Sequence, residues 1–179
     1  MGVFQIGGKV DLIHHPLNLE SASLFVEKHH RHSKPLKRHK FTIGAWEGYN
    51  RSHYFFDWCL GIVTVDNCSS ALTKYRDHIE FRRVCIHPKA SHLNVASFLM
   101  GKAMNSVYSM GYRVIITYTK PYESGASLKA CGFFIQDVNF KRNLVRWVAS
   151  STDRHPCLKR TNAILEILKP LREKKDEIL

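Results

Sequence analysis

The chain has 179 residues, of which 44% are hydrophobic and 11% aromatic, and its formal net charge is +12. This length is enough for one domain with a buried core, and the composition excludes an intrinsically disordered protein. The high positive charge favours a polyanionic partner such as DNA, RNA or a phosphate-rich cofactor.

Membrane and secretory segments are not expected. No apolar run is long enough to span a bilayer, and the first residues lack the basic-then-apolar layout of a signal peptide. The five cysteines form no CxxC pair, and several lie in apolar runs. We therefore expect a cytoplasmic protein with reduced, buried thiols and no structural zinc site.

The first half of the chain predicts one helix among three strands. A short strand is predicted at 10–14, and Asn18 is a suitable N-cap for a helix over 19–29 whose apolar residues share one face. A basic run broken by Pro35 follows the helix. The next two apolar segments are predicted to be adjacent strands, at 41–46 and 59–65.

The second half predicts a strand–helix–strand unit. Residues 79–86 alternate as a strand that Pro88 ends, and apolar residues from Val95 to Met110 recur at helical spacing until Gly111. A buried strand follows at 114–118. The remaining predictions are a short helix at 125–130, strands at 133–137 and 144–148, and a terminal helix at 162–175 interrupted by Pro170.

This order predicts an α/β domain with a mixed sheet. The crossover after residue 79 requires a parallel strand pair, and ligands of such sheets bind at the carboxyl ends of the strands. We expect the cleft near residues 86–97 and 118–127. The domain is predicted to cover residues 1–150, with a basic helical extension at 151–179 that packs on it or trails from it.

The basic run at residues 26–41, VEKHHRHSKPLKRHKF, contains four histidines. In an extended segment, His30 and His32 would face one way, an arrangement suited to metal ligation, proton transfer or stacking on a base. Because few further ligands are available, we expect no metal. The basic side chains are predicted to track phosphates, and these are Lys28, Arg31, Lys34, Lys37, Arg38, His39 and Lys40. Aromatic residues of the next loop are candidates for stacking on an extruded base, or for hydrophobic covering: Tyr49, Tyr54, Phe55, Phe56 and Trp58.

The stretch from Ile79 to Phe134 resembles the strand–helix–strand core of the GNAT superfamily of N-acetyltransferases, and more closely a phage and prophage branch related to the Mom DNA-modification protein. The likeness covers roughly residues 25–135. It rests on an ordered set of short motifs: His30, His32, Lys34, Pro35, His39, Lys40 and Phe41; Glu80 and Arg83; Asn94 and Ser97; Tyr118, Thr119, Glu123, Gly125 and Ser127.

The resemblance implies a GNAT-like fold, with a central mixed sheet of about six to seven strands flanked by helices, and acetyl-CoA or another acyl-CoA-like donor. In the superfamily, a Q/R-x-x-G-x-G/A loop brings backbone N–H groups to the donor's pyrophosphate. This chain reads SHLNVA there, with Asn94 in place of the first glycine. The residues implied to bind the donor are Arg83, Asn94, Ala96, Ser97, Gly125 and Ser127.

The candidate catalytic residues each have a structural alternative. Glu80 could act as a general base, or form an ion pair with Arg82 or Arg83. Arg83 could clamp a phosphate or carboxylate, or form that same ion pair. Tyr118 could donate a proton to a leaving group or be a core tyrosine. Glu123 and the histidines His30 and His32 complete the candidate set, whereas Ser124 or Ser127 could be only a helix cap.

These expectations favour a group transferase of the Mom-like type that modifies an exocyclic amine of a DNA base, adenine-like, with an acyl-derived donor. One alternative is a conventional acyl-CoA-dependent N-acetyltransferase acting on a protein or a small amine. Another is an inactive GNAT-like module that binds nucleic acid or a host protein.

Overall fold

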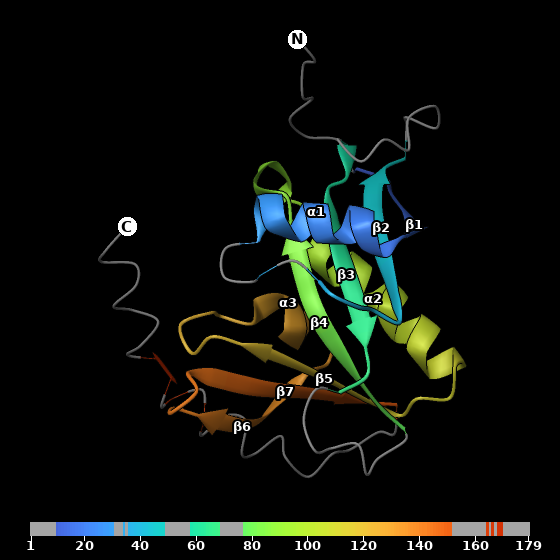
Figure 1. Ribbon diagram of the computed structural model, residues 1–179. Coiled ribbons are helices and arrows are strands. Elements are labelled where there is room, and N and C mark those ends of the chain that lie inside the picture. Colours follow the sequence, from blue (N-terminus) through green and yellow to red (C-terminus); the bar gives the residue numbers. More distant parts are fainter. Residues whose placement is uncertain are drawn as a thin grey trace.

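The computed structural model describes residues 10–30, 34, 36–48, 58–68, 77–151, 164, 166 and 168–169. A seven-stranded mixed sheet in the order β1-β2-β3-β4-β5-β7-β6 forms its frame (Figure 1). The strands are β1 (Leu12–Leu17), β2 (Phe41–Glu47), β3 (Gly61–Asp66), β4 (His78–Ile86), β5 (Val114–Thr119), β6 (Phe134–Asn139) and β7 (Leu144–Ser150). The helices are α1 (Leu19–His29), α2 (Val95–Ser109), α3 (Ala126–Ala130) and the 3-10 turn η3 (Pro88–Ala90). The predicted order of elements and the α/β class with a mixed sheet are confirmed.

The edge strand β1 is longer than the sequence pattern predicted. Strand β1 was predicted to end at residue 14, but it continues through Pro16 to Leu17. Proline is tolerated there because β1 is an edge strand, whose second row of backbone groups needs no ladder partner. Among the strands that the structure describes, only β4 and β5 form a parallel pair, as the predicted crossover requires.

Helix α1 begins at the predicted cap. The Asn18 side chain accepts a hydrogen bond of 2.8 Å from the Ser21 backbone N–H, and Glu20 lies in the first turn. The helix then buries Ala22, Phe25 and Val26 against the sheet. Local sequence and tertiary packing therefore agree over the whole helix.

Replacing Asn18 by alanine should lower the free energy of unfolding by about 1 kcal/mol, because the Ser21 N–H loses its acceptor. Urea unfolding monitored by circular dichroism measures the change. Asn18→Ser, which retains a capping oxygen, should recover most of the stability, and equal loss in both variants would contradict the assigned cap.

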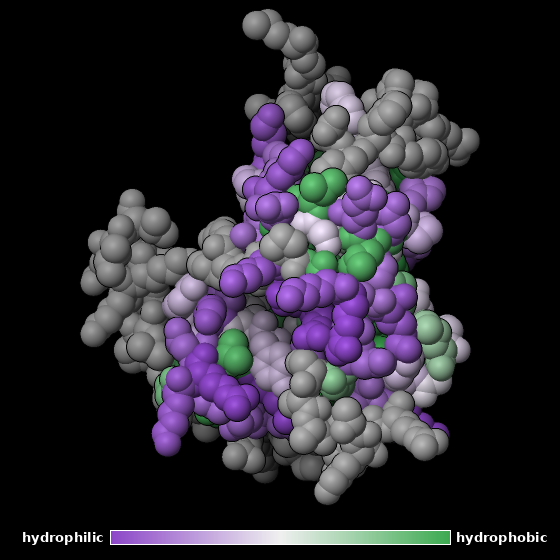
Figure 2. All heavy atoms as spheres, viewed as in Figure 1, coloured by the Kyte–Doolittle hydropathy of each residue, from purple (hydrophilic) through white to green (hydrophobic). Residues whose placement is uncertain are grey.

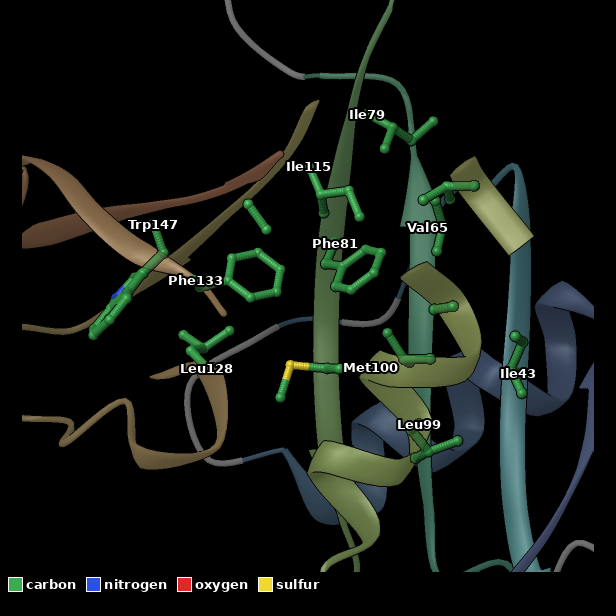
Figure 3. Packing of buried hydrophobic residues seen from close by; sticks show 14 of the residues in the cluster. Ile43, Val65, Ile79, Phe81, Leu99, Met100, Ile115, Leu128, Phe133 and Trp147 are labelled. Atoms are coloured by element: carbon green, nitrogen blue, oxygen red, sulfur yellow. The ribbon is translucent and has the colours of Figure 1, made fainter. Parts of the chain in front are cut away.

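Helices cover both faces of the sheet. Figure 1 shows α1 crossing in front of β2, β3 and β4, while α2 lies behind them. The α2 side contains the main core, in which Met100 points from the helix toward Leu128 of α3 (Figure 3). The α1 side contains a smaller cluster that includes Phe25, Trp46 and Cys85. Leu168, in the predicted terminal helix, is completely buried in the main core, so this part of the chain packs on the domain.

Strand β4 contains a bulge that the sequence pattern did not predict. Thr64 of β3 is paired with Arg83, but the next residue, Val65, is paired with Phe81, so Arg82 is an extra residue. Ile79 and Phe81 lie in the main core, and after the bulge it is Val84 and Ile86 that pack there. A bulge of one residue causes this change of face and leaves two consecutive arginines at the kink.

Strands β4 and β5 diverge immediately before this bulge (Figure 1). Their parallel pairing covers only His78–Glu80 and Val114–Ile116. Beyond it, the Thr117 hydroxyl donates a hydrogen bond of 2.9 Å to the Phe81 carbonyl. A side-chain hydrogen bond thus replaces backbone pairing where the two strands separate. The separation leaves an opening in the sheet that α2 and α3 border. No helix in the described part of the chain is long and apolar enough to cross a membrane.

Candidate active site

The opening between β4 and β5 is a cleft of about 590 Å³. Its walls come from the second half of β4, the end of β5, the first turns of α2, and the loop that leads into α3. Sequence-predicted site residues in its lining are His30, Glu80, Arg83, Ala96, Tyr118, Glu123, Gly125 and Ser127. The segments predicted to flank a ligand therefore do meet in space, and this volume suits a small-molecule site.

Glu80 is the last residue of β4 that is paired with β5, and its carboxylate is almost completely buried. Its Oε1 lies 3.7 Å from Nη1 of Arg82, whose Nη2 lies 3.4 Å from Oδ2 of Asp66. Asp66 in turn is 3.1 Å from Nε of Arg38. A continuous chain of ion pairs therefore links Arg38 of the basic run to the cleft. Of the two arginines predicted as alternatives, it is Arg82 that forms the ion pair with Glu80.

Asp66 is the central anion of this chain, with 6% of its side chain exposed. Asp66→Asn should lower the free energy of unfolding by about 1–3 kcal/mol, because Arg82 keeps only the longer contact with Glu80. The Arg38 contact adds little, since 67% of that side chain is exposed.

Urea unfolding measures this loss, and Asp77→Asn is the matched control. Asp77 pairs with His78 at 2.9 Å, but 44% of its side chain is exposed. Equal stability of Asp66→Asn and Asp77→Asn would contradict a structural role for the Asp66 network.

Arg83 differs from its neighbour Arg82. Its Nη1 donates a hydrogen bond of 2.7 Å to the Arg82 carbonyl, whereas its buried Nε has no hydrogen-bond partner in the described structure. Burial and the adjacent Arg82 charge lower the pKa of this guanidinium, and Glu80 partly opposes that effect. A cation thus lines the cleft without the carboxylate partner that the sequence allowed for.

Tyr118 is half-buried on β5 and has two environments. It lines the cleft, and its ring packs beside a small apolar cluster of Ile116, Phe134 and Val148. Tyr118 therefore has one side in the cleft, as a functional role requires, and another side packed on apolar residues, as for a core tyrosine.

The loop before α3 is shaped by local hydrogen bonds. The Glu123 carboxylate accepts a hydrogen bond of 2.6 Å from the Lys120 N–H, and the Ser124 hydroxyl accepts one of 3.3 Å from the Ala126 N–H. Glu123 thus closes a turn, which gives it a structural role, and Ser124 stabilises the loop before α3, whose N-cap position is Gly125. Gly125 has a φ of +63° and lies against the Trp147 ring, while Ser127 lines the cleft.

The first turn of α2 faces the cleft through Ala96. Asn94 is the N-cap by position, but no side chain caps this turn and no acidic residue lies in it. Asn94 is exposed, and neither it nor Ser97 is among the cleft-lining residues; the Ser97 carbonyl instead accepts a weak hydrogen bond from the Cys131 thiol at 3.6 Å. The backbone N–H groups of the turn, rather than these side chains, are suited to an anion.

Several side chains of the basic run form contacts within the protein. Besides the ion pair of Arg38, the His39 ring nitrogen is 2.6 Å from the Thr42 hydroxyl, and the Lys40 ammonium lies 5.7 Å from the centre of the Tyr112 ring. Lys28, Lys34 and Lys37 are exposed. Arg31, His32 and the predicted stacking residues Tyr49, Tyr54, Phe55 and Phe56 lie outside the described residues, and Trp58 is 64% exposed.

His29 belongs to the basic run and ends α1, with its ring 4.5 Å from that of His87. Burial, the His87 ring and Lys28 together lower the pKa of His29 below the ordinary value of 6.5. The unfolded chain therefore binds this proton more readily than the folded one, and the free energy of unfolding should fall as the pH drops below about 6.5. Urea unfolding at pH 7.5 and 5.5 should give a smaller pH effect for His29→Gln than for the wild type. The exposed His92→Gln serves as control, and an unchanged pH effect in His29→Gln would contradict this assignment.

The cysteines of the described structure are unsuited to nucleophilic catalysis. Burial raises the pKa of Cys59 and Cys68 to about 11 and that of Cys85 to about 12, and it also raises the pKa of Cys131. Thiols with such pKa values remain protonated at neutral pH. Among the described residues, no group of three or more His, Cys, Asp or Glu side chains is arranged to hold a metal ion.

Sequence reasoning missed several cleft-lining residues, namely Arg82, Thr117, Lys120 and Leu144. The strand bulge that presents Arg82 and Arg83 had a visible signal, because two adjacent arginines interrupt the apolar alternation of β4. Thr117 and Leu144 had none, since each looks like an ordinary strand residue.

The fold is similar to that of acetyltransferases of known structure. A Desulfovibrio desulfuricans protein assigned to the GNAT family matches with a TM-score of 0.59 at 11% identity, over 79% of this chain and 100% of that chain. An N-acetyltransferase from Staphylococcus aureus gives 0.59 at 13%, over 78% and 98%. An acetyltransferase from Bacillus subtilis in complex with CoA gives 0.55 at 15%, over 80% and 100%. At such identities the likeness establishes the GNAT-like fold alone. No protein-family model matches the chain, and no curated protein matches it.

Proposed function

We propose that this protein transfers an acyl-derived group from a CoA-type donor to an amine. The observation that carries the proposal is the divergence of β4 and β5 beside an uncapped first turn of α2, which opens a cleft into the sheet. The GNAT-like fold supports it, as does the CoA complex of the Bacillus subtilis acetyltransferase with a similar fold.

The donor would be held mainly by backbone groups. The first-turn N–H groups of α2, near Ala96, suit a pyrophosphate because no side chain or acidic residue competes for them. When bound, the donor supplies the activated acyl carbonyl and a thiol leaving group. The Asn94 substitution in the loop is compatible with this arrangement, since its side chain forms no cap hydrogen bond.

Two side chains are assigned to proton transfer. The Glu80 carboxylate accepts the proton that the acceptor amine loses as the nitrogen–carbon bond forms, and the Tyr118 hydroxyl supplies a proton to the departing sulfur. Direct transfer to the acceptor, without an acyl-cysteine intermediate, agrees with the raised pKa of Cys68, which lies near Glu80 and Arg82.

For the acceptor we infer an exocyclic amine on a DNA base, which is the Mom-like activity. The net charge of +12 and the exposed side chains of Lys34 and Lys37 support a polyanionic partner. In Figure 2, hydrophilic side chains predominate on the face below α1, with hydrophobic residues scattered among them. A protein or small-molecule amine is the second candidate, because Arg38, His39 and Lys40 already contact protein groups.

The deciding experiment is expression in a bacterial host followed by mass spectrometry of the nucleosides in its DNA. A new modified nucleoside is the expected result, and it should disappear with Glu80→Gln. An unchanged nucleoside profile from folded protein would refute the DNA acceptor. Calorimetry with acetyl-CoA tests the donor separately, and failure to bind acetyl-CoA or any other acyl-CoA would refute acyl transfer.

A further inference from the structure

We propose that Arg83 binds an anionic group of the substrate, a carboxylate or a phosphate, at the reacting end of the cleft. This proposal rests on the proposed function, because it specifies the chemistry of the molecule that the cleft receives. It assigns Arg83 to substrate selection rather than to the donor's pyrophosphate.

The charge of Arg83 is not matched by an ion pair in the part of the chain that the structure describes. Its Nε is buried without a hydrogen-bond partner in the described structure, and the one hydrogen bond from its Nη1 is to a neutral carbonyl. Withdrawing part of a guanidinium from water is unfavourable, and this burial is the largest cause of the lowered pKa of Arg83, which Arg82 lowers further and Glu80 partly opposes. A bound oxyanion would offset that cost.

The adjacent arginine provides an internal comparison. Arg82 lies 3.4 Å from the Asp66 carboxylate and 3.7 Å from that of Glu80, so its charge is matched within the protein. Within the residues that the structure describes, no carboxylate lies within ion-pair distance of Arg83. The bulge thus presents two guanidinium groups side by side, one used for structure and one available to a ligand.

Arg83 lies in the second half of β4, immediately after the bulge. The strand continues for three more residues to Ile86 before the chain turns toward α2. At a rise of about 3.3 Å per residue, the end of the strand lies ~10 Å from Arg83. Before the bulge, Glu80 of β4 is the last residue paired with β5, and Thr117 of β5 lies where the two strands separate. Arg83 is thus midway along β4 between Glu80 and Ile86, and its electrostatic interaction with Glu80 means that an anion on Arg83 would lie near that carboxylate.

Arg83 lines the cleft, and a guanidinium group binds carboxylates and phosphates through charge-assisted hydrogen bonds. At the reacting end, such a group can belong to the acyl portion of the donor, as a distal carboxylate, or to the acceptor, as a phosphate beside the amine. Both sources share the same oxyanion chemistry.

The test compares the wild type with Arg83→Gln and with Arg142→Gln, a control that removes one positive charge from an exposed turn. Calorimetry measures binding of acetyl-CoA, succinyl-CoA and a short single-stranded oligodeoxynucleotide. If the donor carries the anion, Arg83→Gln should weaken succinyl-CoA binding about 10- to 100-fold and leave acetyl-CoA binding nearly unchanged. If the acceptor carries it, the oligonucleotide should show the selective loss.

Two results would overturn the proposal. One is binding of succinyl-CoA and the oligonucleotide by Arg83→Gln that matches Arg142→Gln, whether or not acetyl-CoA binds. The other is an equal loss for acetyl-CoA and succinyl-CoA, which would place Arg83 at the pyrophosphate. Failure of the wild type to bind acetyl-CoA would count against the proposed function alone, since the oligonucleotide arm does not depend on the donor.

Protein stability provides a second measurement. Because the charge of Arg83 is unmatched, Arg83→Gln should unfold at the same urea concentration as the wild type or a higher one, whereas Arg82→Gln should unfold earlier. A binding loss in a variant of undiminished stability shows that the guanidinium contacts the ligand. Unfolding of Arg83→Gln as early as that of Arg82→Gln would instead make Arg83 a structural residue and overturn the proposal.

Discussion

Glu80→Gln is expected to lower kcat by about 100- to 10,000-fold, because the glutamine amide cannot accept the proton of the acceptor amine. The carboxylate lies in the cleft wall, on the last residue of β4 that is paired with β5. Its size and shape are retained in glutamine, which can still accept a hydrogen bond from Arg82. The measurement is the rate of CoA thiol release with the acceptor identified by nucleoside mass spectrometry.

The control for this prediction is Glu47→Gln, which removes one negative charge at the exposed end of β2. It should leave kcat unchanged. Donor binding by Glu80→Gln should remain close to that of the wild type, since the carboxylate is assigned to proton transfer and not to the pyrophosphate. A kcat of Glu80→Gln within threefold of the wild type would show that another group, or water, removes the proton.

Gly125→Ala is expected to lower the free energy of unfolding by about 2–5 kcal/mol through two effects. Gly125 has a φ of +63°, which side chains with a Cβ rarely adopt. A Cβ would also lie 2.3 Å from Cζ2 of Trp147, a ring that is completely buried and whose Nε1 donates a hydrogen bond of 2.9 Å to the Thr119 hydroxyl. The ring cannot move away without disturbing the main core. Urea unfolding measures the loss, and donor binding should weaken with it because α3 borders the cleft.

Gly132→Ala separates the two effects. Gly132 also has a positive φ, +80°, but no atom lies within 4 Å of the position that its Cβ would occupy. This variant should lose only about 1 kcal/mol, which is the cost of the backbone conformation. Equal losses in the two variants would show that contact with Trp147 contributes nothing.

Much of the architecture could be predicted from the sequence because local signals were strong. Asn18 and the apolar face of α1 defined that helix to the residue, and the crossover after β4 required the parallel pair that the structure contains. The clustering of Glu80, Arg83, Tyr118 and Gly125 in one cleft also follows from that crossover, since parallel strands direct their carboxyl ends toward the same edge of the sheet. Their catalytic and binding roles remain predictions.

The sequence by itself determined the order of elements, the mixed sheet and the approximate place of the cleft, because periodicity, caps and breakers act over a few residues. Only the tertiary structure decided which charges are matched. The sequence allowed either arginine of β4 to pair with Glu80, and the choice of Arg82 depends on a bulge against β3 and on Asp66, which is distant along the chain. Likewise, the ion pair of Arg38 in the basic run joins it to Asp66, which lies 28 residues away along the chain. Long-range pairing of charges is not encoded in local patterns, and for that reason the unmatched Arg83 became visible only in the fold.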